Sequence, residues 1–176
     1  MRALDVSQDG RHLVYVTETR AGAALAFHDM ENGETRLLPE TNGAFSPSFS
    51  PDGRSIAFLS GTELKKIPAA GGTVEVICDA KDGRGGSWSP ADVIVFAPSN
   101  NGPLQSVSAN GGEPKAATTL DAARGETGHR FPWFLPDGRH FLFAALPEHN
   151  QKYDLYAGSI DGPARQTVTS AENAAV

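Results

Sequence analysis

Cysteine is almost missing from this sequence: Cys78 is the single one among 176 residues. One thiol excludes an internal disulfide framework and leaves the redox compartment open. Runs of Lys and Arg are missing too, and together with a formal net charge of -6 this argues against a nucleic-acid-binding surface. Long apolar runs are also lacking, since residues 141–146 are among the longest and a membrane-spanning helix needs about 20 residues. Residues 1–5 have no charged-then-apolar signal design, so any targeting segment is expected to lie outside this chain.

Glycine and proline are abundant instead, with 19 and 12 residues, which suits many short strands joined by tight turns. One turn motif occurs four times, at residues 7–11, 50–54, 89–92 and 135–139, and a short apolar segment follows each copy. The equivalent residues Gly10, Gly53, Asp92 and Gly138 are spaced 43, 39 and 46 residues apart. A period near this length, with β-type segments inside it, is typical of the blades of a β-propeller.

Each copy of the motif predicts a tight turn between two antiparallel strands. In the second copy Pro51 fixes φ, Asp52 tolerates the bridge conformation and Gly53 can take a positive φ, which favours a type I turn with a bulge. In the third copy an Asp replaces the glycine, and Asp is among the few residues that accept left-handed geometry. The residues assigned to turn formation are Asp9, Gly10, Asp52, Gly53, Asp92, Asp137 and Gly138. The Asp-Gly pairs lack the acidic residues that follow in calcium loops, so no metal is expected there.

Aromatic side chains occupy matching positions on the two strands that flank each turn. They are Phe49, Trp88 and Phe134 before the turn, and Tyr15, Phe58, Phe96 and Phe143 after it. Because side chains alternate between the two faces of a strand, we expect these rings to point the same way in every unit. The pattern therefore predicts that one face of each unit is buried against its neighbour.

The fold class predicted is all-β, a propeller of four-stranded antiparallel blades with four blades in this chain. The blades are expected at about residues 3–38, 44–79, 86–119 and 130–168, within a segment 1–169, and residues 170–176 are expected to form a disordered tail. Closure at four blades is at the small end of the known range, so the chain is expected to be part of a larger ring of six or more. The first and fourth blades would then each expose a face, which predicts contact with further blades or self-association.

The repeats resemble the TolB-like propeller repeat, in which this turn precedes an apolar strand and a Gly-Gly turn such as Gly71-Gly72 follows about 20 residues later. Residues 64–72, 83–88 and 125–139 are similar to the C-terminal propeller of bacterial eukaryotic-like serine/threonine protein kinases. That resemblance implies an extracytoplasmic module, on the periplasmic side of an inner-membrane protein whose kinase domain is cytoplasmic. This sequence has no Gly-rich phosphate loop opening a helix, no His-Arg-Asp loop and no Asp-Phe-Gly motif, so phosphotransfer by this chain is not expected.

Catalytic and metal-binding patterns are lacking as well. Ser87 is not followed by the glycine that a Gly-x-Ser-x-Gly nucleophile elbow requires. The five histidines, His12, His28, His129, His140 and His149, are scattered without the spacing of a zinc site. The sequence therefore predicts no catalytic residue, no metal and no cofactor.

A binding site is predicted on the long connection at residues 120–129 and on the loop before the third blade. The candidate ligand-binding residues are Arg84, Arg124, His129, Arg130 and Trp133. If the two loops share one face, the three arginines approach one rim, which could hold an anionic group or a peptide carboxylate. The alternative is a solvated loop in which the arginines cap strand-end carbonyls.

Three functional hypotheses follow. The first is a non-catalytic module that binds a protein or a small ligand, as the sensory or regulatory region of a bacterial serine/threonine kinase-type signalling protein. The second is the substrate-gating propeller of a prolyl oligopeptidase-type peptidase whose hydrolase domain is elsewhere. The third is a structural fragment without independent activity. Fold alone does not choose among them.

Overall fold

The computed structural model describes residues 4–147 and 153–169, so the predicted tail at 170–176 and His149 lie outside the described residues. The described chain is all-β and forms four antiparallel sheets of four strands each, as the repeats predict. One short 3-10 helix, η1 (Ala122–Arg124), interrupts the strands. Within the described ranges no helix has the length and apolar character needed to cross a membrane.

Each sheet is one blade, and its strands pair in the order in which they occur in the chain. The first blade consists of β1 (Leu4–Val6), β2 (His12–Thr19), β3 (Gly22–Asp29) and β4 (Thr35–Leu37). The second consists of β5 (Ala44–Phe49), β6 (Ser55–Ser60), β7 (Glu63–Pro68) and β8 (Glu75–Asp79). The third consists of β9 (Gly86–Trp88), β10 (Val93–Phe96), β11 (Gln105–Ser108) and β12 (Lys115–Ala116). The fourth consists of β13 (Glu126–Phe134), β14 (His140–Pro147), β15 (Asp154–Ser159) and β16 (Gly162–Thr169).

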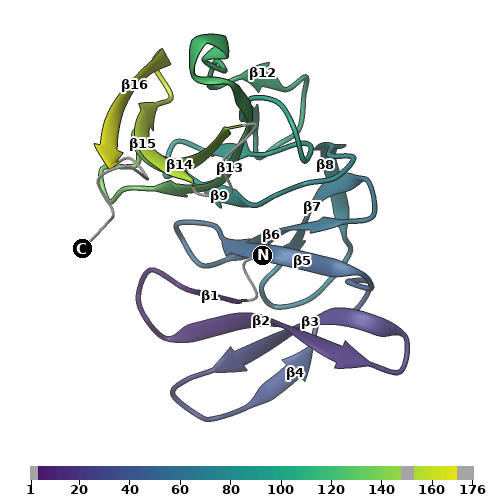
Figure 1. Ribbon diagram of the computed structural model, residues 1–176. Helices are drawn as coiled ribbons and strands as arrows, with labels where there is room; N and C mark the ends of the chain where they lie inside the picture. Colours follow the sequence, from purple (N-terminus) through teal and green to yellow (C-terminus); the bar gives the residue numbers. More distant parts are fainter. Residues whose placement is uncertain (1–3, 148–152, 170–176) are drawn as a thin grey trace, which may run out of the picture.

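The blades follow one another around an arc (Figure 1), with the first at the bottom of the view and the fourth at the top left. Contacts between successive blades involve the first strand of each, so that β1 lies against β5, β5 against β9 and β9 against β13. These four strands are therefore the innermost strands of the arc. Their side chains surround the position of a propeller's central channel.

The repeated motif forms the turn between the first and second strand of each blade. Gly10, Gly53 and Gly138 have φ values of 73°, 70° and 66°, in the left-handed region that favours glycine. Asp92 takes their place in the third blade with φ 56°, as the sequence predicts. In the second blade the Ser50 hydroxyl donates to Asp52 Oδ1 at 2.6 Å.

Side chains are buried between blades in three clusters, one for each pair of neighbours. Phe58, Phe96 and Phe143 have no exposed surface and lie one in each cluster, which confirms their predicted equivalence. Tyr15 has the same register but is only half-buried. The reason is that this face of the first blade lies on the outside of the arc, where no preceding blade is present in the structure.

Two predicted boundaries were wrong. The fourth blade begins at Glu126 rather than residue 130, because β14 extends to Pro147 and provides Glu126 and Gly128 with pairing partners. His129 is consequently a strand residue and not part of the connecting loop. The third blade was predicted to run to residue 119, but its last strand, β12, ends at Ala116.

The inner strands of the second and fourth blades both contain a β-bulge that no sequence pattern predicts. Ser46 and Phe131 both have positive φ, at 51° and 54°, and each lies where the strand register shifts. In the third blade the corresponding residue is Gly85, with φ 99°. The second, third and fourth blades thus share a left-handed residue at this position of the inner strand, although only the third blade has glycine there.

Candidate functional site

The four inner strands converge on one pocket at the turn end of the arc, with a volume of about 260 Å³. Each blade contributes a short consecutive stretch around its repeated turn. The lining residues are Asp5, Val6 and Gln8 from the first blade, Ser48, Phe49, Ser50 and Pro51 from the second, Ser87, Trp88 and Pro90 from the third, and Trp133, Phe134, Leu135 and Pro136 from the fourth. Because its walls come from every blade, the pocket is a property of the assembled arc and not of one repeat.

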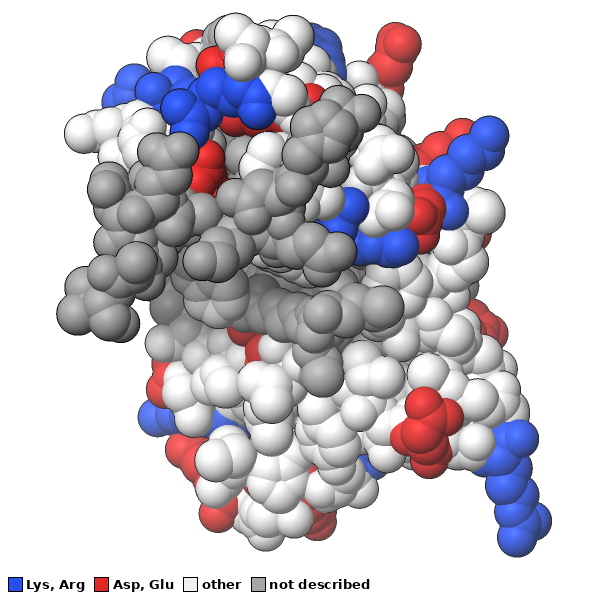
Figure 2. All heavy atoms as spheres, in the orientation of Figure 1, with Lys and Arg blue, Asp and Glu red and all other residues white. Residues whose placement is uncertain are grey.

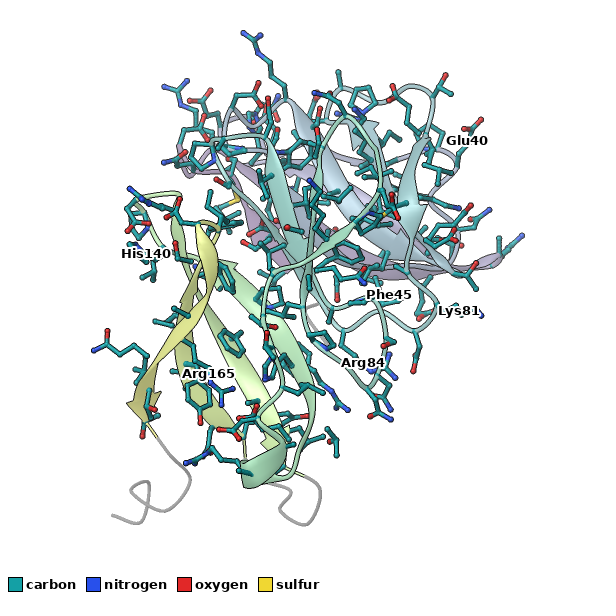
Figure 3. All side chains as sticks on the ribbon, turned by 90° about the horizontal axis from the view of Figure 1, so that it is seen from above. Glu40, Phe45, Lys81, Arg84, His140 and Arg165 are labelled. Carbon is teal, nitrogen blue, oxygen red and sulfur yellow. The ribbon has the colours of Figure 1, made fainter. Side chains whose placement is uncertain are left out.

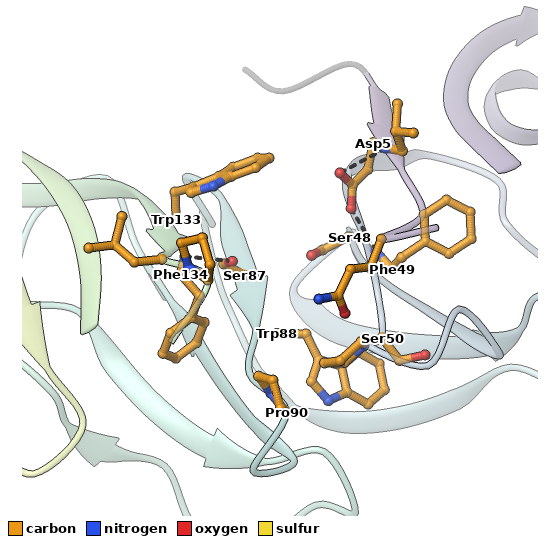
Figure 4. Close-up of a pocket in the computed structure, with 14 residues that line it drawn as sticks. Asp5, Ser48, Phe49, Ser50, Ser87, Trp88, Pro90, Trp133 and Phe134 are labelled. Carbon is orange, nitrogen blue, oxygen red and sulfur yellow. Dashed lines mark hydrogen bonds between the residues drawn. The ribbon is translucent and has the colours of Figure 1, made fainter. Parts of the chain in front are cut away.

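Polar groups in this pocket also hold neighbouring blades together (Figure 4). Asp5 Oδ2 accepts a hydrogen bond of 2.8 Å from the Phe49 amide of the next blade. At the equivalent position of the third blade, the Ser87 hydroxyl accepts one of 3.1 Å from the Phe134 amide. Trp133 occupies this position in the fourth blade, and it faces the pocket from the side opposite Asp5. Half of the Trp133 surface is exposed, at 49%, so its indole is the largest apolar group available to a ligand here.

Arg84 and Arg130 approach each other on a separate part of the molecule, around Asn100. Arg84 Nε donates to Asn100 Oδ1 at 3.2 Å, and Arg130 Nη2 donates to the Asn100 carbonyl oxygen at 2.8 Å. Arg84 Nη1 also forms an ion pair of 2.6 Å with Asp82, and Arg130 Nη1 donates to the Tyr153 hydroxyl at 3.1 Å. Both guanidinium groups therefore hold loop segments in place.

Arg124 does not share that arrangement. Its Nη2 pairs with Asp154 Oδ2 at 2.9 Å, linking η1 to the start of β15. Two of the three predicted rim arginines thus meet at Asn100, while the third makes its contact elsewhere. Trp133, the fifth predicted residue, lines the channel pocket instead.

His129 is buried and belongs to a polar cluster that joins the fourth blade to the connection before it. We call it the β13–β16 cluster, and it consists of Thr118, Asp121, Glu126, His129 and Arg165. His129 Nδ1 lies 2.8 Å from the Thr118 hydroxyl, and Nε2 lies 3.1 Å from Glu126 Oε2. Because the ionised Glu126 carboxylate can only accept, the imidazole proton lies on Nε2, and Nδ1 accepts from the Thr118 hydroxyl, whose oxygen accepts from the Leu104 amide. Arg165 Nη1 completes the cluster with a 2.7 Å contact to the same Glu126 oxygen.

The side chain of Arg165 crosses the face of the sheet to reach Glu126, because β16 and β13 are the two edge strands of this blade. Its guanidinium lies 4.2 Å from the ring centroid of Tyr156 on β15. Tyr156 in turn stacks on Phe143 of β14 at 5.7 Å, and Phe143 lies 4.7 Å from the His129 ring. Figure 3 shows Arg165 on the fourth blade, apart from Arg84. All four strands of this blade are therefore connected by one chain of ring and charge contacts.

Burial and pairing set the ionisation of this cluster. Burial lowers the pKa of His129, and this outweighs the opposite effect of the Glu126 carboxylate. Burial acts to raise the pKa of Glu126, but hydrogen bonds from Arg165, the Asp121 amide and His129 bring it below its usual value. Glu126 Oε1 has no partner in the described structure and is fully buried. At neutral pH the cluster thus contains a neutral imidazole between a carboxylate and a threonine hydroxyl.

Sequence reasoning selected His129 as a ligand-binding residue, whereas its side chain is buried in this cluster, and it did not select Glu126, Arg165 or Asp121. Glu126 and His129 are three residues apart, which in a regular strand places side chains on opposite faces. The register shift between Glu126 and Gly128 brings both side chains to the same face, and no residue pattern predicts that shift. In the parts of the chain that are described, no group of three or more His, Cys, Asp or Glu residues is arranged to hold a metal ion.

Charge gives no further site on the visible surface. On the face shown in Figure 2, acidic and basic side chains are interspersed, and uncharged residues make up most of the area. The pocket lined by the four inner strands, which we call the channel pocket, is therefore the candidate binding site that the geometry favours. The contacts of Arg84 and Arg130 with Asn100, and the β13–β16 cluster, hold the surrounding structure together.

Comparison with solved structures places this architecture among known folds. A TolB-type protein of Agrobacterium tumefaciens superposes with a TM-score of 0.79 at 17% identity, covering 94% of this chain and 63% of that one. The fold is a TolB-like β-propeller. TolB of Acinetobacter baumannii matches with a TM-score of 0.78 at 18% identity, over 95% of this chain and 43% of the other. The propeller domain of the Trilobed protease of Pyrococcus furiosus matches with a TM-score of 0.60 at 14% identity, over 96% of this chain and 57% of that domain.

Among curated proteins, the propeller is 28% identical over 165 residues to the uncharacterized peptidase YuxL of Bacillus subtilis. That alignment covers 85% of this chain but only 23% of YuxL, so the chain spans about a quarter of this relative's length. No protein-family model matches the sequence. The four blades thus correspond to parts of larger chains in each of these comparisons.

Proposed function

We propose that this propeller is a non-catalytic binding module that takes a short, mainly apolar peptide segment at the mouth of its central channel. The observation that carries the proposal is the pocket of about 260 Å³ to which all four inner strands contribute. Its walls combine Pro51, Pro90, Pro136 and the half-exposed Trp133 with a few polar groups, which is the composition of sites that fix an apolar ligand by a small number of hydrogen bonds.

We further propose that the whole protein to which such a module belongs is a peptidase, in which the propeller selects or admits the substrate. The relationship to YuxL favours this context, and tricorn protease, whose structure matches with a TM-score of 0.56 over 84% of this chain, is consistent with it. The kinase-type signalling context, which rests on residues 64–72, 83–88 and 125–139, remains the second candidate. None of the matched proteins named above is a kinase.

The tryptophans allow a direct test of binding, because both tryptophans of the chain, Trp88 and Trp133, line the pocket. Capped peptides of four to ten residues rich in Phe, Leu and Pro are titrated against the purified chain, with Lys-rich and Asp-rich peptides as comparison. The expected result is a saturable change in tryptophan emission with the apolar peptides, since a ligand that covers Trp133 removes it from water. Calorimetry then measures the affinity for Trp133→Ala, and Tyr153→Ala serves as a matched control because Tyr153 is also a part-exposed aromatic and does not line the pocket.

Loss of binding in Trp133→Ala but not in Tyr153→Ala supports the proposal. Equal affinity in all three proteins, or no saturable signal with any peptide, contradicts it. Peptide cleavage or ATP hydrolysis that survives repurification would contradict the non-catalytic part.

A further inference from the structure

Backbone hydrogen bonds join the third blade to the fourth beside the β13–β16 cluster. Gly102, in the loop between β10 and β11, donates to the Thr127 carbonyl at 2.8 Å and accepts from the His129 amide at 3.0 Å. Further along β13, the Phe131 amide donates at 3.0 Å to the carbonyl of Arg84, in the segment that leads into β9. We call the amides of Gly102, His129 and Phe131 the junction amides. Because each bonds across the junction, the exchange of their hydrogens reports whether the two blades are together.

A chain of side-chain hydrogen bonds crosses the same junction. The Leu104 amide, next to β11, donates to the Thr118 hydroxyl oxygen at 2.9 Å, and that hydroxyl donates to His129 Nδ1 at 2.8 Å. His129 Nε2 donates in turn to Glu126, which also binds Arg165 of β16. One imidazole therefore connects the third blade to the first and last strands of the fourth.

The junction between the first and second blades has the same threonine contact without a titratable partner. The Leu25 amide donates to Thr41 Oγ1 at 3.0 Å, as Leu104 does to Thr118, and each threonine lies on the connection to the next blade. The Thr41 hydroxyl, however, donates to the Leu38 carbonyl at 2.8 Å. A carbonyl oxygen accepts at any pH, whereas histidine Nδ1 accepts only while the imidazole is neutral. Of these two junctions, only the later one depends on the protonation state of a side chain.

A second proton on His129 removes the acceptor that Thr118 uses. With both ring nitrogens protonated, Nδ1 becomes a donor facing the Thr118 oxygen, and the hydroxyl proton is left without its acceptor. Thr118 is only 3% exposed, so water does not replace that acceptor while the junction is closed. A buried donor without a partner is costly, which favours a state in which Thr118 and His129 separate and reach solvent.

The charges around the ring do not remove this penalty. Side chains reach the His129 ring or its partners from every neighbouring element: Glu126 of β13, Phe143 of β14, Tyr156 of β15, Arg165 of β16, and Thr118 and Asp121 of the connection. The two carboxylates favour an imidazolium, whereas the Arg165 guanidinium, 3.4 Å from Nε2, opposes it. The imidazole has no exposed surface, and burial lowers the pKa of His129 overall. The closed junction therefore disfavours a proton that an open junction accepts.

We infer that uptake of one proton from solvent by His129 opens the junction between the third and fourth blades, so that mild acid loosens this junction and leaves that of the first and second blades closed. The inference is independent of the proposed ligand site, because Thr118, Glu126 and His129 do not line the channel pocket.

Hydrogen exchange measured by NMR on the unmodified chain tests this, with each rate divided by the intrinsic rate of that amide at the same pH. The opened junction exposes a histidine with an ordinary pKa of about 6.5, so the open fraction is expected to rise up to about 30-fold from about pH 7.5 to about pH 5. The junction amides should show this rise. The control amides are those of Leu25 and Gly43, since Gly43 donates to the Ala23 carbonyl of the first blade at 2.7 Å.

Two variants assign the effect to His129. His129→Gln keeps a donor and an acceptor but takes up no proton, so its rise is expected to stay below about twofold. His140→Gln is the matched control, because His140 lies in the same blade, in a half-exposed ion pair with Asp137, and this variant should keep the full rise. If His129→Gln does not fold, Thr118→Val replaces it. Without the hydroxyl that needs Nδ1, protonation costs less in the closed junction, and the rise is expected to shrink.

The inference is overturned by a rise of less than about twofold at the junction amides of the unmodified chain. An equal rise at the Leu25 and Gly43 amides overturns it too, since acid would then loosen the blades without regard to the histidine. A full rise in His129→Gln, or in Thr118→Val where that variant is used, overturns it as well.

Discussion

Replacement of Arg165 by Leu removes the cation that spans the fourth blade and leaves Glu126 buried without it. The side chains of Arg165 and Glu126 are exposed by only 16% and 2%. Breaking a buried ion pair from one side costs about 3 to 5 kcal/mol, because the remaining charge stays in a medium of low polarity. Arg165 is not fully buried, and His129 and the Asp121 amide still bind the Glu126 carboxylate, so we expect about 3 kcal/mol.

The same blade contains a matched control. Arg139 forms an ion pair with Asp161, but both side chains are largely exposed, at 64% and 51%. Exposed pairs contribute about 0 to 1 kcal/mol, so Arg139→Leu is expected to have little effect. Thermal unfolding measures both variants, and for a chain of this length 3 kcal/mol corresponds to about 6 to 12 °C in Tm.

A double variant separates the charge from the packing. Arg165→Met combined with Glu126→Gln removes both charges and keeps side chains of similar length, so much of the lost stability is expected to return. The reasoning is refuted if Arg165→Leu lowers the free energy of unfolding by no more than Arg139→Leu does. It is refuted equally if the double variant is less stable than Arg165→Leu alone.

Three more predictions concern the buried rings, a turn and pH. Ala in place of Phe58, Phe96 or Phe143 is expected to cost about 3 to 5 kcal/mol each, and denaturant midpoints that indicate less than about 1 kcal/mol for all three would contradict the shared register. Gly53→Val is expected to lower the Tm, because a β-branched residue is disfavoured at the observed φ of 70°; an unchanged Tm would show that the turn adapts. The pKa of His129 is lower in the folded chain than in the unfolded one, so the contribution of this residue to the free energy of unfolding is fully present above the unfolded pKa and is lost as pH falls below about 6.5. His129→Gln should make the free energy of unfolding less dependent on pH over that range. An unchanged pH dependence would count against the buried neutral imidazole.

The fold was predictable because local chemistry repeats. A turn such as Asp52-Gly53 is determined by a few neighbouring residues, and strands of alternating polarity on both sides determine which rings are buried. The same alignment gave Tyr15 the correct register, although its side chain is only half-buried. The repeats therefore predicted both where the strands lie and which face of each strand is buried.

The polar contacts were not predictable in the same way. Arg165 meets Glu126 across 39 residues of sequence and three strand pairings, and the contact depends on a register shift that no pattern marks. Arg84 and Arg130 meet at Asn100 while Arg124 does not, and the Asn100 carbonyl and side chain that hold the first two come from a third loop. Contacts between side chains that are distant in the sequence can be identified only once the tertiary structure is known.

The arc also determines how the molecule comes apart. The second and third blades are each covered on two faces, whereas the first and fourth are each covered on one, so the cost of detaching a blade is unequal along the chain. In a repeat array of this kind, stability is a sum of terms for each unit and for each contact between neighbours, and the end units open first. Three residues of the β13–β16 cluster, Glu126, His129 and Arg165, lie within the fourth blade and connect its first and last strands, where only one neighbouring blade of this chain supports them. Amide hydrogens of the middle blades should accordingly exchange with solvent last.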